Sequence, residues 1–317
     1  MPPDKASVLD AADRIAPYIH RTPVLTCNTI NRMFGGEIFF KCENFQKAGA
    51  FKSRGATNAV FLLGTDETRN GVATHSSGNH AGALALAASR RGITANIVMP
   101  ENSSRIKIKA VESYGGLITL CKPTLDAREE TLKEVISKTG AVEIHPYNDF
   151  RIIAGQATAA KELIEEVNDL RQIMAPVGGG GLLSGTALSA RYFGNHIRVI
   201  AAEPAGADDA FRSFTSGTFI PSVDPRTIAD GLRTSLGSLT FPIIMENVDD
   251  IVTVSEEGII EAMRLIWERM KIIVEPSSAV PLAAIIENKL NISGKRTGII
   301  LSGGNVDLAN LPFNTTV

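Results

Sequence analysis

Hydrophobic residues along the chain alternate between short runs rich in β-branched residues and longer stretches with helical spacing. Segments such as Ala81–Ser89 and Ala159–Val167 are typical of amphipathic helices. Strands that alternate with helices favour an α/β fold whose mainly parallel sheets are covered by helices. The predicted strands are Glu37–Lys41, Val72–His75, Ala95–Val98, Leu117–Leu120, Val142–His145, Ile173–Val177, Val199–Ala202, Ile251–Val254 and Gly298–Leu301.

One block of the chain contains four closely spaced strand–helix units, beginning at Gly71. We expect it to form a small domain of residues 71–148. The large domain would then be discontinuous, built from residues 1–70 and 149–317. This division predicts a cleft between the domains, which is a common position for a small-molecule site.

The composition of the chain limits the kinds of molecule that it is expected to bind. The 317 residues carry a formal net charge of -2, so bulk electrostatics offers no binding to nucleic acid or to an anionic membrane. No apolar run approaches the roughly 20 residues of a membrane span, and the first residues lack the apolar core of a signal peptide. Three widely spaced cysteines suggest neither a disulfide framework nor a zinc site. We expect a cytoplasmic protein whose partners are small molecules or other subunits.

A glycine-rich turn is the strongest local feature. It consists of Gly178, Gly179, Gly180 and Gly181, follows an apolar strand and opens a helix. Its backbone N–H groups can converge on one point, and the helix N-terminus adds a positive dipole end, which suits a phosphate. Close strand–helix packing is the alternative explanation. Because Leu183 replaces the last glycine of GxGxxG and no Gly-Lys-Ser/Thr follows, a phosphate monoester fits better than a nucleotide.

Two further turns and one lysine are also candidate functional segments. Ser76-Ser77-Gly78-Asn79-His80 precedes a helix and could hold a carboxylate, although a well-capped helix explains it equally. Ser302 follows the last predicted strand, at the edge where α/β sites gather. Lys52 precedes a predicted helix and would by itself be a solvated charge. Together, an anion cradle, a carboxylate clamp and an amine are what an imine-forming cofactor requires.

These segments resemble a known family. Lys41-Cys42-Glu43-Asn44-Phe45-Gln46-Lys47, Phe51-Lys52-Ser53-Arg54-Gly55-Ala56, the Ser76 turn, the glycine turn and Ser302-Gly303-Gly304-Asn305-Val306-Asp307 are similar to fold-type II pyridoxal-phosphate enzymes, which have the tryptophan synthase β-like fold. Within this class the chain resembles serine racemases and their serine/threonine dehydratase relatives. The likeness covers the chain from about Ile15 to Asp307, with its motifs in the expected order.

The resemblance implies a role for each matching position. Lys52 would carry pyridoxal 5'-phosphate and act as the base on one face of Cα, and Phe51 would flank the ring. Asn79 would bond the phenolic oxygen, and Ser302 would face the pyridine nitrogen. Residues 178–181 with Leu182 would hold the phosphate. The substrate carboxylate would be bound by Ser76, Asn79 and the helix start after His80.

Three further positions match substrate-side residues of the racemases. Ser77 matches the second acid/base, and racemisation needs two opposed proton carriers. Dehydratases can also have serine there, so Ser77 permits racemisation without proving it. Arg128 and His145 match residues near the substrate, although a surface charge and a structural histidine are the simpler explanations.

The resemblance also implies a metal and a nucleotide. Glu203, the carbonyl of Ala207 and Asp209 match a loop that would bind Mg²⁺, Ca²⁺ or Mn²⁺. An ATP site at a homodimer interface is matched by Lys47, Tyr114, Lys271 and Asn305, but Ala48 replaces a hydroxyl residue there.

The expected activity is serine racemisation accompanied by serine dehydration to pyruvate and ammonia. The alternative is a dedicated dehydratase of serine, threonine or 3-hydroxyaspartate. Two departures from the family pattern bear on this balance: Ala157 stands where the family has a glycine, and Tyr147 stands where some racemases have an asparagine. A β-replacement enzyme and a silent binding protein are the more distant alternatives.

Overall fold

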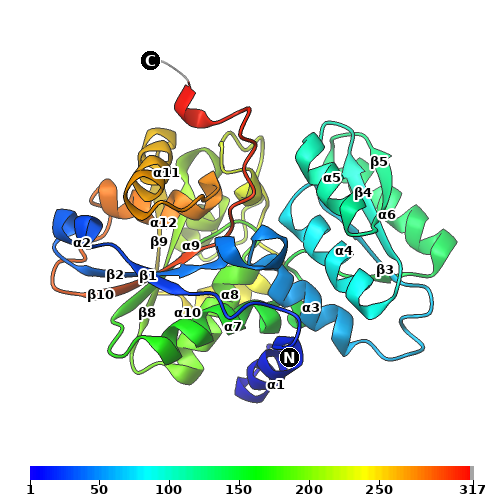
Figure 1. Ribbon diagram of the computed structural model, residues 1–317, viewed down its shortest axis with the longest axis horizontal. Helices are drawn as coiled ribbons and strands as arrows, with labels where there is room; N and C mark the ends of the chain where they lie inside the picture. Colours follow the sequence, from blue (N-terminus) through cyan, green and yellow to red (C-terminus); the bar gives the residue numbers. More distant parts are fainter. Residues whose placement is uncertain (315–317) are drawn as a thin grey trace.

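The computed structural model describes residues 1–314, which form two parallel sheets in two halves of the molecule (Figure 1). The large sheet has the order β1-β2-β10-β7-β8-β9, and only β1 runs antiparallel. Its strands are β1 (Val24–Thr26), β2 (Glu37–Cys42), β7 (Gln172–Pro176), β8 (Arg198–Pro204), β9 (Asp250–Val254) and β10 (Arg296–Leu301).

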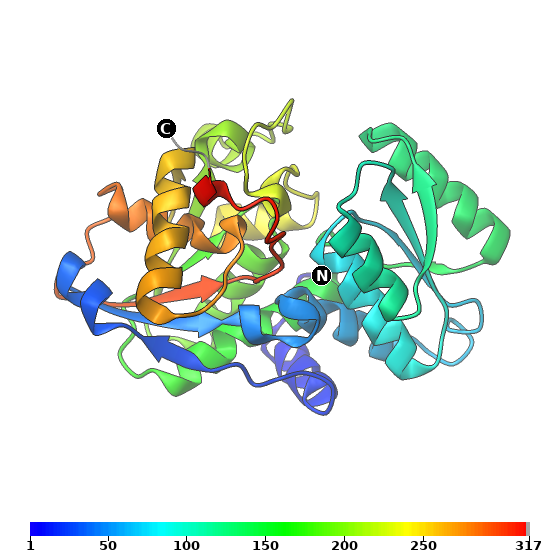
Figure 2. The same cartoon turned by 45° about the horizontal axis from the view of Figure 1, so that its top comes forward.

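The small sheet has the order β5-β4-β3-β6, with all strands parallel. Its strands are β3 (Val72–His75), β4 (Ala95–Pro100), β5 (Leu117–Cys121) and β6 (Val142–Glu143), and the helices α4 (Asn79–Arg91), α5 (Arg105–Ser113) and α6 (Leu125–Thr139) pack on them. We call the part of the chain from β3 to β6, loops included, the small-sheet half, and the rest of the chain the large-sheet half. Figure 2 shows the two halves side by side.

Helices cover both faces of the large sheet because its strands are apolar on both sides. Side chains alternate across the sheet: Met174 points into one core with α11 and α12, whereas Ile173 and Ala175 point into another with α7 and α8. The helices of the large-sheet half are α1 (Lys5–Ile15), α2 (Asn28–Phe34), α3 (Lys52–Leu62), α7 (Phe150–Glu166), α8 (Gly181–Phe193), α9 (Asp209–Ser216), α10 (Thr240–Asn247), α11 (Glu256–Met270) and α12 (Pro276–Ile286).

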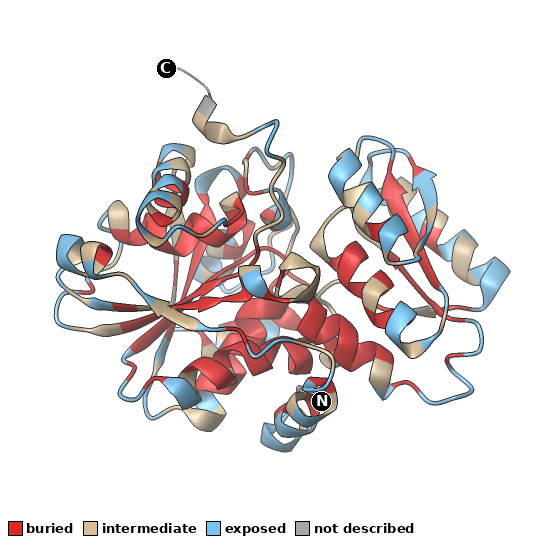
Figure 3. Cartoon of the chain, in the orientation of Figure 1, coloured by how far each residue is buried: buried red, intermediate tan, exposed pale blue. Residues whose placement is uncertain are grey.

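Helix α3 joins the halves by packing against α7 on one side and α4 on the other. Most residues of α3, α7 and α8 are buried, as Figure 3 shows. Gly155 in α7 makes this possible, since a Cβ there would lie 2.6 Å from Cα of Gly55 in α3. Helix α3 is therefore held against α7 by a close backbone contact within the large-sheet half, and its other side packs on α4 of the small-sheet half.

The α/β prediction is confirmed, and each of the nine predicted strands coincides with a strand of the structure. The pattern misses β1, because three residues carry too little periodicity to be recognised. The last predicted strand of the small sheet shortens to β6, because the ring of His145 accepts the backbone N–H of Asn148 and turns the chain. No helix within residues 1–314 is long and apolar enough to cross a membrane.

Candidate active site

The predicted site residues gather at the carboxyl edge of the large sheet, where it faces the small-sheet half. The glycine turn follows β7, and Ser302 follows β10, which lies next to β7 in the sheet. The backbone N–H of Phe51 donates to the carbonyl of Ser302 at 2.9 Å, and Ala50 forms a bridge with Gly303. The turn that carries Lys52 is thereby fixed to the end of β10.

Lys52 is the first residue of α3, whereas the sequence pattern predicts that it precedes the helix. Its Nζ donates to the carbonyl of Pro146 at 2.8 Å and lies 5.2 Å from the ring centre of Phe51. Desolvation lowers the pKa of Lys52 to about 8, and the charge of Glu275 partly opposes this shift. At pH 8 about half of the amines are therefore neutral and able to react as nucleophiles.

Buried ion pairs anchor the start of α3. Arg54 has a fully buried side chain that bonds both oxygens of Glu43 and both oxygens of Glu162. Lys41 donates to Glu162 at 2.6 Å. These contacts tie α3 to β2 and α7 two residues from Lys52. Lys41, Glu43 and Arg54 lie in segments that carry the family resemblance, whereas Glu162 lies in α7. Their pairing across the fold cannot be read from the sequence.

The glycine turn is closely enclosed. A Cβ on Gly178 would lie 2.8 Å from Cα of Leu232, and one on Gly179 would overlap the ring of Tyr147. Gly180 has φ +86°, a conformation that side chains other than glycine rarely adopt. Each of these positions therefore requires glycine.

The N–H groups of this turn are free to hold an anion. Within residues 1–314, the backbone N–H groups of Gly178, Gly179 and Gly180 have no acceptor, and α8 begins directly after them with an uncapped N-terminus. Buried N–H groups without partners are costly, and the positive end of a helix favours a negative ligand. Leu182, the next predicted member, is buried at the start of α8.

Ser302 is only 3% exposed and is held by the first turn of α12. Its hydroxyl lies 3.1 Å from that of Ser278, which also bonds the backbone N–H and carbonyl of Gly303. The side chain is thus oriented by its surroundings.

Asn79 begins α4 and reaches the large-sheet half. One N–H of its amide donates to Glu275 at 2.8 Å, and its oxygen accepts from Asn305 at 3.0 Å. The second N–H of the amide is left for a ligand. Glu275 was not predicted; the signal in the sequence is Glu275-Pro276, in which proline sets the start of a helix.

The turn before α4 carries Ser76 and Ser77, both partly exposed. The hydroxyl of Ser76 accepts the N–H of Gly78 at 3.3 Å, whereas that of Ser77 makes no such bond within the described part of the chain. Lys107 of α5 lies near Gly78 and forms an ion pair with Asp230 of the large-sheet half. This pair, also unpredicted, joins the two halves over the site.

Three histidines line the small-sheet side. The ring of His80 is buried, with Nε2 3.1 Å from the carbonyl of Ile144, and desolvation holds its pKa well below the usual value. Desolvation also lowers the pKa of His145 to about 4, and its ring meets that of Tyr147 edge-on at 4.6 Å. His75, not predicted, has its pKa lowered by desolvation and by the charge of Arg128. Arg128 therefore lies near the site, on α6.

The sequence matches the family described as pyridoxal-phosphate dependent enzyme over residues 15–303. The chain belongs to this family.

The match is supported by relatives that align over nearly the whole chain. The beta-hydroxyaspartate dehydratase of Paracoccus denitrificans is 51% identical, covering 98% of this chain and 99% of its own. The serine racemase of Dictyostelium discoideum is also 51% identical, covering 96% and 95%. The crystal structure of that racemase superposes with a TM-score of 0.92 over 96% of this chain and 99% of its own.

The residues of this pyridoxal-phosphate dependent enzyme fit the cofactor that the family implies. The unpartnered N–H groups of the glycine turn fit a phosphate, and the amine of Lys52 fits an aldehyde. Ser302 and the spare N–H of Asn79 fit the polar atoms of a pyridine ring. No group among them would repel such a ligand.

The acidic segment begins with Glu203 near the end of β8 and continues into the start of α9. Glu203 is fully buried and accepts the N–H groups of Ala210 and Phe211 at the start of α9. Both carboxylate oxygens of Asp209 are buried without a hydrogen-bond partner in residues 1–314, and Ser222 lies nearby without hydrogen-bond geometry. Ala207 lies between them in the chain and is also buried. Each oxygen of Glu203 already accepts one backbone N–H, whereas the two oxygens of Asp209 are left to fit a hard cation.

The four predicted nucleotide residues are less clearly grouped. Asn305 donates to the carbonyl of Ala48, which follows Lys47. Tyr114 packs near Gly82 of α4, and Lys271 ends α11 in the left-handed conformation with φ +60°. Among the described residues, no hydrogen bond or ion pair links these four to one another.

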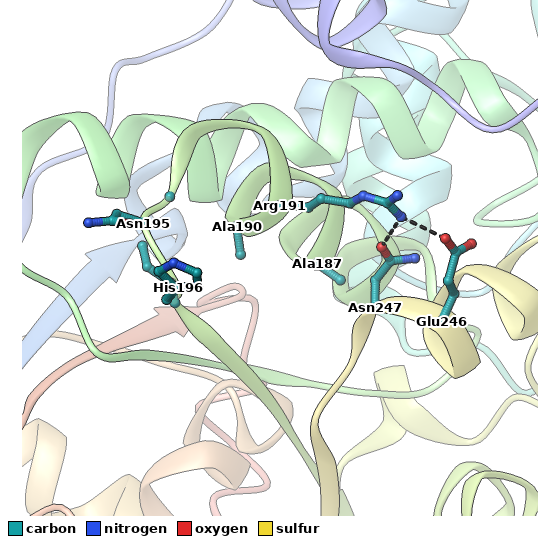
Figure 4. A pocket seen from close by; sticks show the side chains of 9 residues that line it. Ala187, Ala190, Arg191, Asn195, His196, Glu246 and Asn247 are labelled. Atoms are coloured by element: carbon teal, nitrogen blue, oxygen red, sulfur yellow. Dashed lines mark hydrogen bonds and ion pairs between the residues drawn. The ribbon is translucent and has the colours of Figure 1, made fainter.

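A separate hollow lies at the far end of α8, lined in part by Arg191, His196 and Glu246 (Figure 4). Arg191 spans it with bonds to Glu246 and Asn247. Helix α8 begins at the glycine turn and rises about 18 Å to this point, so the hollow is not part of the site.

Proposed function

We propose that this chain interconverts L- and D-serine and also dehydrates serine to pyruvate and ammonia. One observation carries the proposal: the amine of Lys52 bonds Pro146, whose neighbour Tyr147 packs on the glycine turn. The reactive amine and the anion cradle thus both contact the short segment of Pro146 and Tyr147. This arrangement suits a ligand with an aldehyde at one end and a phosphate at the other.

When bound, pyridoxal phosphate would withdraw electrons from Cα of the amino acid joined to it. Lys52 would then remove the Cα proton on one face, as an amine whose pKa of about 8 lies near working pH. Ser77 would return a proton on the other face. If the β-hydroxyl leaves first, the products after hydrolysis are pyruvate and ammonia.

The surrounding residues would orient the substrate. Ser76, Asn79 and the N-terminus of α4 would bind its carboxylate, with the backbone of His80 in the first turn. Phe51 would flank the ring, and Ser302 would bond its nitrogen. A serine does not protonate that nitrogen as a carboxylate would, so the electron demand stays moderate.

A direct test is to incubate the purified protein with L-serine and Mg²⁺ and to measure D-serine and pyruvate in the same tube. D-serine formed at a rate comparable with pyruvate supports the proposal. Pyruvate without D-serine would reject racemisation while leaving the cofactor site intact.

The second candidate is a dehydratase of 3-hydroxyaspartate. It is favoured by the Paracoccus relative, which is as similar to this chain as the Dictyostelium racemase. Arg128 near His75 and Tyr147 could pair with the second carboxylate of such a substrate. If so, Arg128→Met lowers kcat/KM for 3-hydroxyaspartate at least tenfold more than for serine, about 1.4 kcal/mol. An equal loss on both substrates would argue against this role.

A metal and a partner subunit complete the proposal. Glu203, Asp209 and the carbonyl of Ala207 would bind Mg²⁺, with Ca²⁺ or Mn²⁺ as substitutes, in a stabilising role.

A homodimer is supported by the exposed apolar side chains of Phe45 and Ile273. The segments that carry them are joined by a hydrogen bond from Asn44 to the carbonyl of Ile273. ATP as an activator, the cytoplasmic location and the small domain of residues 71–148 stay predictions from the sequence.

A further inference from the structure

Glu275 precedes α12 as its N-cap residue but does not cap that helix with its side chain. An acidic N-cap ordinarily accepts an N–H of its own first turn. Here the carboxylate instead accepts from Asn79, which belongs to the small-sheet half 196 positions away in the chain. The chain thus gives up a local hydrogen bond for one across the site.

The carboxylate is deeply buried and incompletely paired. Glu275 is 3% exposed, and its Oε2 has no hydrogen-bond partner within residues 1–314. A Cβ on Gly303 would lie 2.5 Å from its Oε1, so the backbone of Gly303 closes over it. Burying a carboxylate in this way is costly unless a positive charge or a ligand compensates.

Two cations act together with this carboxylate. Lys107 attracts its charge, and Lys52 lies two residues after Ala50, whose Cβ and the Glu275 carboxylate both lie against Gly303. Glu275 is the one charged residue that acts on the ionisation of Lys52, and it opposes the desolvation of that amine. Conversely, desolvation raises the pKa of Glu275 to about 7. The negative charge of Asp230 acts in the same direction, and the positive charge of Lys107 opposes it. Lys52, Asp230 and Lys107 are therefore the charged groups that face this carboxyl.

We propose that Glu275 is a positioning residue of the cofactor site, which orients the amide of Asn79 and supplies the buried negative charge that keeps a proton on the nitrogen of Lys52. The inference rests on the proposed cofactor roles of Lys52 and Asn79. It does not depend on which amino acid is the substrate.

The charge is tested by Glu275→Gln, which keeps the shape and the oxygen that Asn79 bonds. We expect the pH midpoint of the visible absorbance of the holoenzyme to fall by about one unit, since the protonated form loses its counter-charge. A midpoint equal to that of the parent would overturn the charge role.

The role of Glu275 in orienting Asn79 is tested by Glu275→Asp, which keeps the negative charge on a side chain that is one methylene group shorter. We expect the titration midpoint to stay within a few tenths of a unit. Cofactor release, followed by ultrafiltration, should become several-fold faster than in the parent and in the Gln variant. Release at the parent rate would overturn the orienting role.

Glu256→Gln provides a matched control. Glu256 starts the neighbouring helix α11, and its Oε1 also lacks a partner within residues 1–314, but it does not act on Lys52. We expect neither midpoint nor release rate to change. Both readouts need only the bound cofactor, so the inference can fail while serine is turned over, and it can hold even if serine is not a substrate.

Discussion

At the scale of single residues, Lys52 differs from the other lysines of the chain in its surroundings. Desolvation by the packed segments around it lowers its pKa to about 8, while a bond to Pro146 directs its amine towards the segment that covers the glycine turn. A surface lysine would stay protonated and mobile at neutral pH. The chemistry therefore depends on where the fold places this amine.

Replacing Lys52 by alanine tests that placement. We expect Lys52→Ala to lower racemisation and dehydration by at least about 10³-fold, because the base and the cofactor attachment are lost together. The visible absorbance of the cofactor should also change. Lys138→Ala, at an exposed ion pair, should behave as the parent. A Lys52→Ala protein with undiminished turnover would exclude the enzyme mechanism proposed here.

Gly179 is the residue-scale test of the anion cradle. In Gly179→Ala the new methyl group would overlap the ring of Tyr147, so we expect a loss of about 1–3 kcal/mol in cofactor affinity or in stability. Equilibrium cofactor binding and urea unfolding measure the two effects. In Gly64→Ala the methyl group would lie 3.4 Å from its nearest neighbour, and this control should change little. Unchanged cofactor binding in Gly179→Ala would contradict the cradle.

At the scale of elements, α3 and α12 position most of the site. Helix α3 carries Lys52 and is held by Arg54, whereas the start of α12 holds Ser302 through Ser278 and Asn79 through Glu275. Neither function is visible in hydrophobic periodicity. Both arise from polar side chains buried at the first turn of a helix.

Removing the Arg54 guanidinium tests how α3 is anchored. Arg54→Met would leave Glu43 without its cationic partner and Glu162 with Lys41 alone, so we expect the free energy of unfolding to fall by about 3–5 kcal/mol. Urea denaturation measures this loss. Arg191→Met, which breaks an exposed pair with Glu246, should cost less than about 1 kcal/mol. Equal losses in the two variants would show that the buried network does not stabilise α3.

At the scale of the whole molecule, the site lies between two halves that several contacts join. Helix α3 packs against α4, Asn79 bonds Glu275 and Asn305, and Lys107 pairs with Asp230. The last of these is partly exposed, so it contributes little to stability. Because it joins the two halves next to Gly78, this pair suits a contact that favours closure on a substrate.

Lys107→Met tests this contact. We expect the KM for serine to rise several-fold while the melting temperature changes by less than a few degrees, because the ion pair orders the cleft more than the fold. Steady-state kinetics and thermal unfolding measure the two quantities. Arg226→Met, which breaks an exposed pair within one loop, is the control. A KM equal to the parent's would contradict a role in closure.

The sequence predicted the two-sheet architecture because strands and helices differ in the periodicity of their hydrophobic residues. It also predicted the segments of the site, since glycine turns and the Lys52 motif are local. It missed Glu275, His75 and the Lys107–Asp230 pair, because each acquires its role from a partner far along the chain. Burial, which lowers the pKa of Lys52 and raises that of Glu275, is likewise a property of the folded molecule.

In the mechanism that we propose, Lys52 and Ser77 act as proton carriers on opposite faces of Cα. This pairing is tested most directly by the ratio of D-serine to pyruvate formed from L-serine by the parent and by Ser77→Ala. We expect this ratio to fall at least tenfold in the variant, with pyruvate still produced, because elimination needs only the proton removal by Lys52. An unchanged ratio would contradict the role of Ser77 and would require another residue to return the proton.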